Sequence, residues 1–172
     1  FVGRLQEWKG VRTILEALSL VPEATLTIAG DGNDRTLLEA YAATLGVSDR
    51  VTFLGAVPRH ELPALMHAHH ALVASSYASE TFGIGLVEAQ ACGLPVIASR
   101  FGGFVEVVSE GHTGLFYPPR DAAALAACMR TLFDQPELRQ RLAHQAPAWA
   151  SQFAWSAVTD RIESVYRRLR GI

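Results

Sequence analysis

Residues 71–98 form the run ALVASSYASETFGIGLVEAQACGLPVIA, which has the pattern of a strand, a turn, a helix and a second strand. We predict strands over 71–74 and 94–98, and between them a helix over 85–92 that Gly93 ends. Both predicted strands are short and almost wholly apolar, which is typical of parallel strands buried on both faces. This unit therefore favours a parallel sheet covered by helices.

The same alternation of strand and helix patterns continues on both sides of this unit. It predicts one α/β domain over residues 1–172, with a Rossmann-like parallel sheet, helices on both faces and further helices at the C-terminus. In such sheets ligands bind at the carboxyl ends of the strands, so we look for function in the turns that follow them. The other predicted strands cover 1–5, 24–29, 51–54 and 114–117, and the other predicted helices cover 9–20, 35–45, 59–67, 121–133, 136–151 and 156–170.

Composition and charge limit the classes of partner. Of the 172 residues, 49% are hydrophobic and 19% are charged, and the formal net charge is -2, as in an ordinary globular domain. Nucleic-acid binding normally requires a basic face, so we expect no nucleic-acid partner. Basic residues cluster only at Arg167, Arg168 and Arg170, and this tail leaves peripheral membrane association open beside a solvated helix end.

The expected location follows from the apolar runs and the cysteines. No apolar run reaches the roughly 20 residues that a transmembrane helix needs, and no secretory leader pattern is present. Cys92 and Cys128 are not spaced as a metal pair, which favours a reducing compartment. We expect a cytoplasmic location, with contact to the inner face of the membrane as the alternative. Because the chain opens without Met inside a strand-like pattern, we also expect a fragment or an excised domain.

Two cations flank the first predicted turn, which begins at Gly3. Arg4 lies at the end of the first predicted strand and Lys9 at the start of the following helix. A cation at a helix N-terminus opposes the helix dipole at a cost of about 0.3–1 kcal/mol. An anion bound between the two cations and the helix amides would reverse that sign. A bound anion and a purely structural arrangement, with Lys9 solvated and Arg4 paired to a carboxylate, fit the sequence equally well.

Glycines follow two other predicted strands. Gly30 and Gly32 come after the strand at 24–29, and Gly102 and Gly103 come after the strand at 94–98. Glycine at such turns lets the backbone approach a ligand closely. Neither turn is specific, because an ordinary connection would use the same residues and the first turn lacks the third glycine of a dinucleotide-binding motif.

The segment 79–88, SETFGIGLVE, gives the strongest indication of a ligand site. Gly83 and Gly85, close to Phe82, indicate a tightly bent backbone with amide groups free to face a ligand. Glu88 falls in the first turns of an otherwise apolar helix, where an unpaired carboxylate is costly. Ribose hydroxyls would satisfy this carboxylate, and so would a structural arginine; we favour the ligand.

The histidines at 67, 69 and 70 lie at a predicted helix-to-strand junction. They have no carboxylate or cysteine companion nearby, so we expect a helix-end cluster and no metal site. The aromatic residues Phe153 and Trp155 are interpreted as packing residues.

The glycine turns and the acidic motif occur in a recognisable order. GRLxxxKG over residues 3–10, GDG over 30–32, ExFGxGLVEAxACGLPV over 80–96 and GGxxE over 102–106 together resemble the C-terminal domain of family-four glycosyltransferases of the GT-B architecture. The resemblance covers essentially the whole chain. It implies the donor-binding half of a retaining enzyme that transfers a hexose from a nucleoside diphosphate sugar to a glycan, lipid or small-molecule acceptor.

The resemblance assigns roles to individual positions. Arg4 and Lys9 look like the pair that binds the donor diphosphate and stabilises it as it leaves. Glu80 resembles the glutamate that faces the hydroxyls of the transferred sugar, and Glu88 resembles the one bonded to the ribose. The implied catalytic residues are thus Arg4, Lys9 and Glu80, and the implied donor-binding residues are Gly3, Gly30, Phe82, Gly83, Glu88 and Gly103.

The implied mechanism needs no metal and no cofactor. Breaking a glycosyl–phosphate bond builds negative charge on the diphosphate, which positioned cations and helix amides stabilise. No DxD-type metal motif is present, in agreement with this expectation. The retained configuration is ascribed in this family to attack on the same face, without a covalent nucleophile in this chain.

The resemblance also implies a partner, an N-terminal domain that carries the acceptor site and lies outside this chain. We therefore expect the chain alone to bind a nucleoside diphosphate weakly and to transfer no sugar. Two rival functions are a non-catalytic nucleotide-binding or scaffolding module and a sugar-nucleotide epimerase of the same architecture. The presence of Arg4, Lys9 and both glutamates favours the transferase. An NAD-binding dehydrogenase is excluded because the first turn, GRLQEWKG, is not glycine-rich.

Overall fold

The predicted strand–helix–strand unit at 71–98 forms as expected in the structure, a computed structural model that describes residues 1–170. It consists of β3 (Leu72–Ala74), α4 (Ile84–Ala91) and β4 (Val96–Ser99). β3 and β4 pair in parallel, and β5 (Gly114–Tyr117) continues the sheet in parallel beside β4. All four residues of β4 are buried, because helices cover both faces of this central strand.

The other piece of the sheet is built from the N-terminal half of the chain. β1 (Leu26–Ala29) pairs in parallel with β2 (Val51–Gly55), and the two pieces are not joined by a continuous ladder. The predicted strand at 1–5 was wrong in extent, because it is reduced to a single parallel bridge between Val2 and Ala29. Beyond that bridge the chain leaves the sheet, and the N–H of Leu5 donates to the carbonyl oxygen of Asp31 at 2.9 Å.

The predicted helices are present in the described residues, with small shifts at their ends. The predicted helix at 9–20 is divided by Gly10 into a 3-10 turn and α1, and the four-residue helix α5 was not predicted. The helices are α1 (Val11–Ser19), α2 (Arg35–Thr44), α3 (Leu62–His67), α5 (Phe104–Val107), α6 (Ala122–Asp134), α7 (Pro136–Ala150) and α8 (Trp155–Arg170), and the 3-10 turns are η1 (Glu7–Lys9), η2 (Ser48–Arg50), η3 (Arg59–Glu61) and η4 (Ser151–Phe153).

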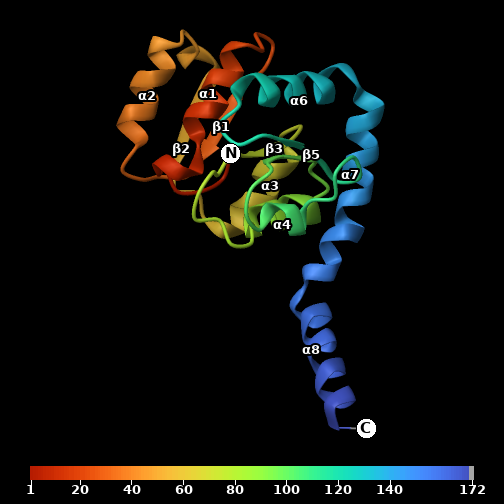
Figure 1. Ribbon diagram of the computed structural model, residues 1–172. Helices are drawn as coiled ribbons and strands as arrows, with labels where there is room; N and C mark the ends of the chain where they lie inside the picture. The colour runs from red at the N-terminus through yellow and green to blue at the C-terminus, as the bar shows by residue number, and fades with distance from the viewer. Residues whose placement is uncertain (171–172) are drawn as a thin grey trace.

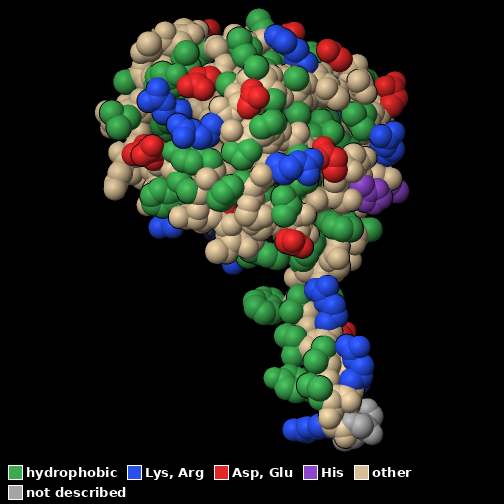
Figure 2. Space-filling view, in the orientation of Figure 1, with side chains coloured by type: hydrophobic (Ala, Val, Ile, Leu, Met, Phe, Trp, Pro, Cys, Tyr) green, Lys and Arg blue, Asp and Glu red, His purple; other side chains and the backbone are tan. Residues whose placement is uncertain are grey.

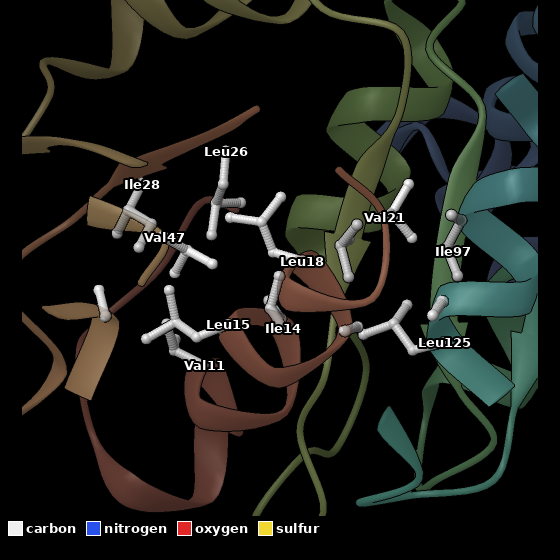
Figure 3. Packing of buried hydrophobic residues seen from close by; sticks show 14 of the residues in the cluster. Val11, Ile14, Leu15, Leu18, Val21, Leu26, Ile28, Val47, Ile97 and Leu125 are labelled. Atoms are coloured by element: carbon white, nitrogen blue, oxygen red, sulfur yellow. The ribbon is translucent and has the colours of Figure 1, made fainter. Parts of the chain in front are cut away.

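The core has two parts, one on each side of the sheet. On one side α1 presents Ile14, Leu15 and Leu18, at helical spacing, to β1 and to Leu125 of α6 (Figure 3). On the other side α4 is apolar nearly all round and is packed between the sheet, α3, α5 and α7. The layers of Figure 1 follow from these two clusters, with α1 and α6 on one face and α3 and α4 on the other.

α8 differs from every other helix because it projects away from the domain (Figure 1). None of its residues is buried. Within residues 1–170, no helix combines the length and the apolar character needed to cross a bilayer.

Candidate functional site

A hollow of about 230 Å³ opens where the two pieces of the sheet meet. Residues 1–3 lie between the two pieces of the sheet. They pair with β1 on one side, and β3 is the first strand of the chain that lies on their other side. The order of the strands therefore reverses at this point, which is where open α/β sheets bind ligands. The polar and charged residues of the lining are Lys9, Ser76, Glu80 and Glu88, and the lining also includes Gly3, Gly83, Ile84, Gly85 and Phe104.

Lys9 is fixed in the hollow by the contact of its own turn with the end of β3. The hydroxyl of Ser75 donates to the carbonyl oxygen of Lys9 at 2.6 Å. Gly10 has a φ of +68°, and a Cβ there would lie 2.1 Å from the carbonyl oxygen of Ser75. The glycine after Lys9 is thus required for this close approach. Lys9 is also the only lysine in the sequence.

Lys9 and Glu80 form an ion pair across the hollow, with 2.7 Å between Nζ and Oε2. Their side chains are 21% and 14% exposed, and the hydroxyl of Ser76 donates to the same Oε2 at 3.0 Å. The structure thus differs from the purely structural arrangement considered from the sequence, because Lys9 rather than Arg4 is the residue paired to a carboxylate. Arg4 is exposed and forms no ion pair with any residue between 1 and 170.

Glu88 lines the hollow from α4 and pairs with an arginine, one of the two arrangements that its position allowed. Its Oε1 lies 2.6 Å from Nη2 of Arg59, which belongs to η3. The Arg59 side chain is 79% exposed and that of Glu88 is 29% exposed. An ion pair open to water contributes roughly 0–1 kcal/mol, so a ligand can displace Arg59 at little cost.

The start of α4 presents unused backbone donors to the hollow. Gly83, with a φ of +92°, is the N-cap of α4 and makes no side-chain cap. No group in the described part of the chain accepts a hydrogen bond from the N–H of Ile84 or Gly85. Free amides and the positive end of the helix dipole attract an anion, and Lys9 lines the same hollow.

The segment 80–83 is held against the turn that follows β4. The N–H of Gly103 donates to the carbonyl oxygen of Glu80 at 3.2 Å. A Cβ at Gly103 would lie 2.2 Å from the carbonyl oxygen of Thr81, and one at Gly102 would lie 2.2 Å from that of Glu80. Gly103 therefore holds the Glu80 segment in place through its backbone, and it does not line the hollow.

The structure brings together only some of the residues that the sequence singled out. Gly3, Lys9, Glu80, Gly83 and Glu88 share the hollow, whereas Arg4, Gly30, Phe82 and Gly103 lie outside its lining. A Cβ at Gly30 would lie 1.8 Å from the carbonyl oxygen of Gly3, so close backbone packing explains this glycine without a ligand.

The sequence did not point to Ser76 or Arg59. Ser75 and Ser76 follow an apolar strand and are 1% and 2% exposed. Two buried serines at the end of a strand would have been a usable signal, because buried hydroxyls need partners. Arg59 gave no signal, since it lies 29 residues before its partner Glu88.

One of the three histidines, His69, has structural contacts of its own. The ring of His69 bonds to the carbonyl oxygen of Leu65 at 2.7 Å and to the hydroxyl of Thr27 at 2.8 Å, which fixes it as a structural residue. No cluster of three or more metal-binding side chains occurs between residues 1 and 170.

Two larger hollows, of about 330 and about 490 Å³, lie elsewhere. The first lies beside β1 and α6, and the second beside Arg12, Asp34 and Arg120. None of the site residues predicted from the sequence lines either of them.

Known proteins match this chain in sequence and in fold. The family model described as "Glycosyl transferases group 1" matches residues 1–149. A D-inositol 3-phosphate glycosyltransferase of Corynebacterium efficiens is 37% identical over 96% of this chain and 41% of its own length. A glycogen synthase of Mycobacterium tuberculosis is 39% identical, with the same two coverages of 96% and 41%. The chain thus spans about two fifths of the length of these curated relatives.

Among solved structures, Anabaena HepE in complex with UDP superposes with a TM-score of 0.86 at 32% identity, over 100% of this chain and 49% of that one. The same protein in complex with UDP-glucose gives a TM-score of 0.84 at 32% identity, over 99% and 48%. The superposition includes α8, so the projecting helix has a counterpart in a chain about twice as long.

Proposed function

The chain belongs to the Glycosyl transferases group 1 family, and from this membership we propose that it is the donor-binding domain of a retaining hexosyltransferase. The observation that carries the proposal is the meeting of Lys9, Glu80, Glu88 and the free end of α4 around one hollow. The cation and the helix amides suit a diphosphate, and the two carboxylates suit the hydroxyl groups of a ribose and of a sugar.

The diphosphate of the donor is placed beside Lys9 and the first amides of α4. Lys9 exchanges its present partner, Glu80, for phosphate oxygens. Arg4 follows Gly3 of the hollow and is exposed and unpaired in the described structure, so it can turn toward the same phosphates. As the bond to the sugar breaks, these positive groups stabilise the charge that develops on the diphosphate, so the proposed chemistry uses no metal or other cofactor.

The two carboxylates then take the hydroxyl groups of the donor. Glu88, once Arg59 has moved away, accepts hydrogen bonds from the ribose. Glu80, released by Lys9 and still bonded to Ser76, faces the transferred sugar. Donor binding is therefore an exchange of partners, in which the ion pairs Lys9–Glu80 and Arg59–Glu88 give way to contacts with the ligand.

α8 supports a second domain as the partner of this one. Trp155 and Leu169 are 86% and 78% exposed, and the curated relatives are more than twice as long as this chain. We propose that a second domain, which carries the acceptor site, covers the apolar stripe of α8. The stripe lies along one side of the helix in Figure 2, and its exposed members are Trp155, Ile162, Val165, Tyr166 and Leu169.

Arginines of α8 outside the apolar stripe favour a second partner, the inner face of a membrane in the cytoplasm. The basic residues are Arg161, Arg167, Arg168 and Arg170, against two acidic residues, Asp160 and Glu163. If these arginines bind no membrane, the chain will stay in the supernatant when vesicles of phosphatidylcholine and phosphatidylserine are sedimented. Pelleting that salt weakens would instead support the membrane.

Calorimetric titration with UDP, GDP and ADP tests the proposed function, and UDP comes first because a related structure holds it. At least one nucleotide should bind to the chain, while UDP-glucose should remain unconsumed, because we place the acceptor site on the second domain. Glu88→Gln should weaken binding about 3- to 10-fold, since a bond to a charged acceptor is worth more than a neutral one. Glu163→Gln, in an exposed ion pair of α8, is the matched control. Binding of none of the three nucleotides would favour the scaffolding alternative.

A further inference from the structure

Phe153, the last residue of η4, touches the segment that carries Glu80. Its ring packs edge-to-face on that of Phe82, with 5.8 Å between the centroids and 76° between the planes. On its other side it packs on Trp149 in the same manner, at 6.2 Å and 70°. The indole N–H of Trp149 donates in turn to the carbonyl oxygen of Val107, in α5, at 2.9 Å. Phe153 and Trp149 therefore connect the C-terminal part of the chain to both turns beside the hollow, the Glu80 segment and the turn that follows β4.

The two turns that Phe153 and Trp149 contact are packed together as one unit. Gly102 and Gly103 pack backbone against backbone with Glu80, Thr81 and Phe82. Phe82 holds one end of the unit through Phe153, and Val107 holds the other through Trp149. Both anchors come from the same short stretch, which includes the end of α7 and η4.

Beyond the Gly103 turn and the ion pair of Glu80 with Lys9, the Glu80 segment has few means of support. Ser79, the residue before Glu80, has a φ of +53°, which is uncommon for a residue with a side chain. Thr81 and Phe82 are exposed, and their N–H groups find no acceptor between residues 1 and 170. The contact with Phe153 therefore adds order to this segment at Phe82.

We propose that Phe153 is a positioning residue for the donor, and that it makes donor affinity depend on the placement of α8. This inference rests on the proposed function of the hollow. The family model ends at residue 149, so Phe153 lies beyond the stretch that it matches. α8 begins at Trp155, directly after the extended residue Ala154, so a shift of α8 is passed to Phe153 over two residues. The second domain that packs on α8 would then shift the position of the Glu80 segment, which faces the diphosphate and the sugar.

The test compares Phe153→Ala with Phe153→Leu and with the control Leu37→Ala, a residue of α2 whose side chain is 70% exposed and does not line the hollow. UDP-glucose and UMP are the probes, because the Phe82 segment faces the diphosphate and the sugar rather than the ribose. Phe153→Ala should weaken UDP-glucose roughly 3- to 10-fold, the value of an edge-to-face aromatic pair, and UMP less than 2-fold. Phe153→Leu should recover part of the loss, and Leu37→Ala should show none.

Hydrogen exchange of the chain without ligand supplies the second measurement. Phe153→Ala should speed exchange at the amides of Gly103 and Leu86, which bond to the carbonyl oxygens of Glu80 and Gly83, and leave α1 unchanged. This pattern separates local positioning from loss of the fold. Equal weakening of both probes, or unchanged exchange at these two amides, would overturn the positioning role. Failure of the wild-type chain to bind any nucleotide would instead overturn the proposed function, and the exchange experiment would still decide the role of Phe153.

Discussion

Replacing Gly103 with alanine is expected to lower the free energy of unfolding by about 2–3 kcal/mol, at the upper end of overpacking costs. The backbone of Gly103 is in the ordinary right-handed region, with a φ of -65°. The penalty therefore comes from contact alone. The added Cβ would lie 2.2 Å from the carbonyl oxygen of Thr81 and 2.5 Å from the backbone nitrogen of Phe82.

To admit that methyl group, the Gly103 turn and the Glu80 segment must move apart. The hydrogen bond from Gly103 to Glu80 would then break, and Glu80 would leave its place beside Ser76. We therefore also expect Gly103→Ala to lose measurable nucleotide binding. For a domain of this size, a loss of 2–3 kcal/mol lowers the Tm by roughly 4–12 °C.

Gly85→Ala is the matched control for stability. A Cβ at Gly85 meets nothing within 4 Å, and the residue lies in α4, where alanine is favoured over glycine. Its Tm should equal or exceed that of the wild type in a thermal melt followed by circular dichroism. A Gly103→Ala chain that melts with the wild type would contradict the tight packing of the two turns.

Lys9→Met should have the largest effect on ligand binding, a loss of roughly 10- to 100-fold in affinity for UDP, the value of a charged hydrogen bond of about 1.5–3 kcal/mol. Methionine keeps the length and the apolar stem of lysine and removes only the charge. Uridine, which carries no phosphate, should bind the variant and the wild type alike.

Salt provides an independent check on Lys9. Raising the ionic strength should weaken UDP binding to the wild type more steeply than to Lys9→Met, because screening acts on the contact between the ammonium and the phosphates. Arg12→Gln is a suitable control, since Arg12 stacks on Tyr41 and does not line the hollow. If Lys9→Met bound UDP as tightly as the wild type, the diphosphate would have to lie elsewhere.

Features encoded by neighbouring residues could be predicted from the sequence. The helical spacing of Val11, Ile14, Leu15 and Leu18 predicted the helix that became α1, and the unbroken apolar run at 94–98 predicted a strand where the structure has the buried β4. The run at 1–5 looked like a strand and is not one. This segment makes a single bridge to β1, because the chain leaves the sheet after Val2 and Leu5 bonds to Asp31 instead.

Features that depend on distant residues could not be predicted. The position of Glu88 on an apolar helix indicated that its carboxylate needed a partner. The neighbouring residues could not identify that partner as Arg59, which lies 29 residues away. Lys9 and Glu80 were each singled out from the sequence, yet their contact spans 71 residues and appears only once the strands are in place. Phe153 was interpreted as a packing residue, and its packing partner turned out to be a residue of the donor motif.

The solitary lysine has a practical consequence for anyone who handles this protein. Reagents that attack lysine side chains can react with this chain only at Lys9. Coupling the chain to a biosensor chip or to a succinimidyl dye at this residue would block the hollow. Immobilisation through an appended affinity tag keeps the Lys9 amine free.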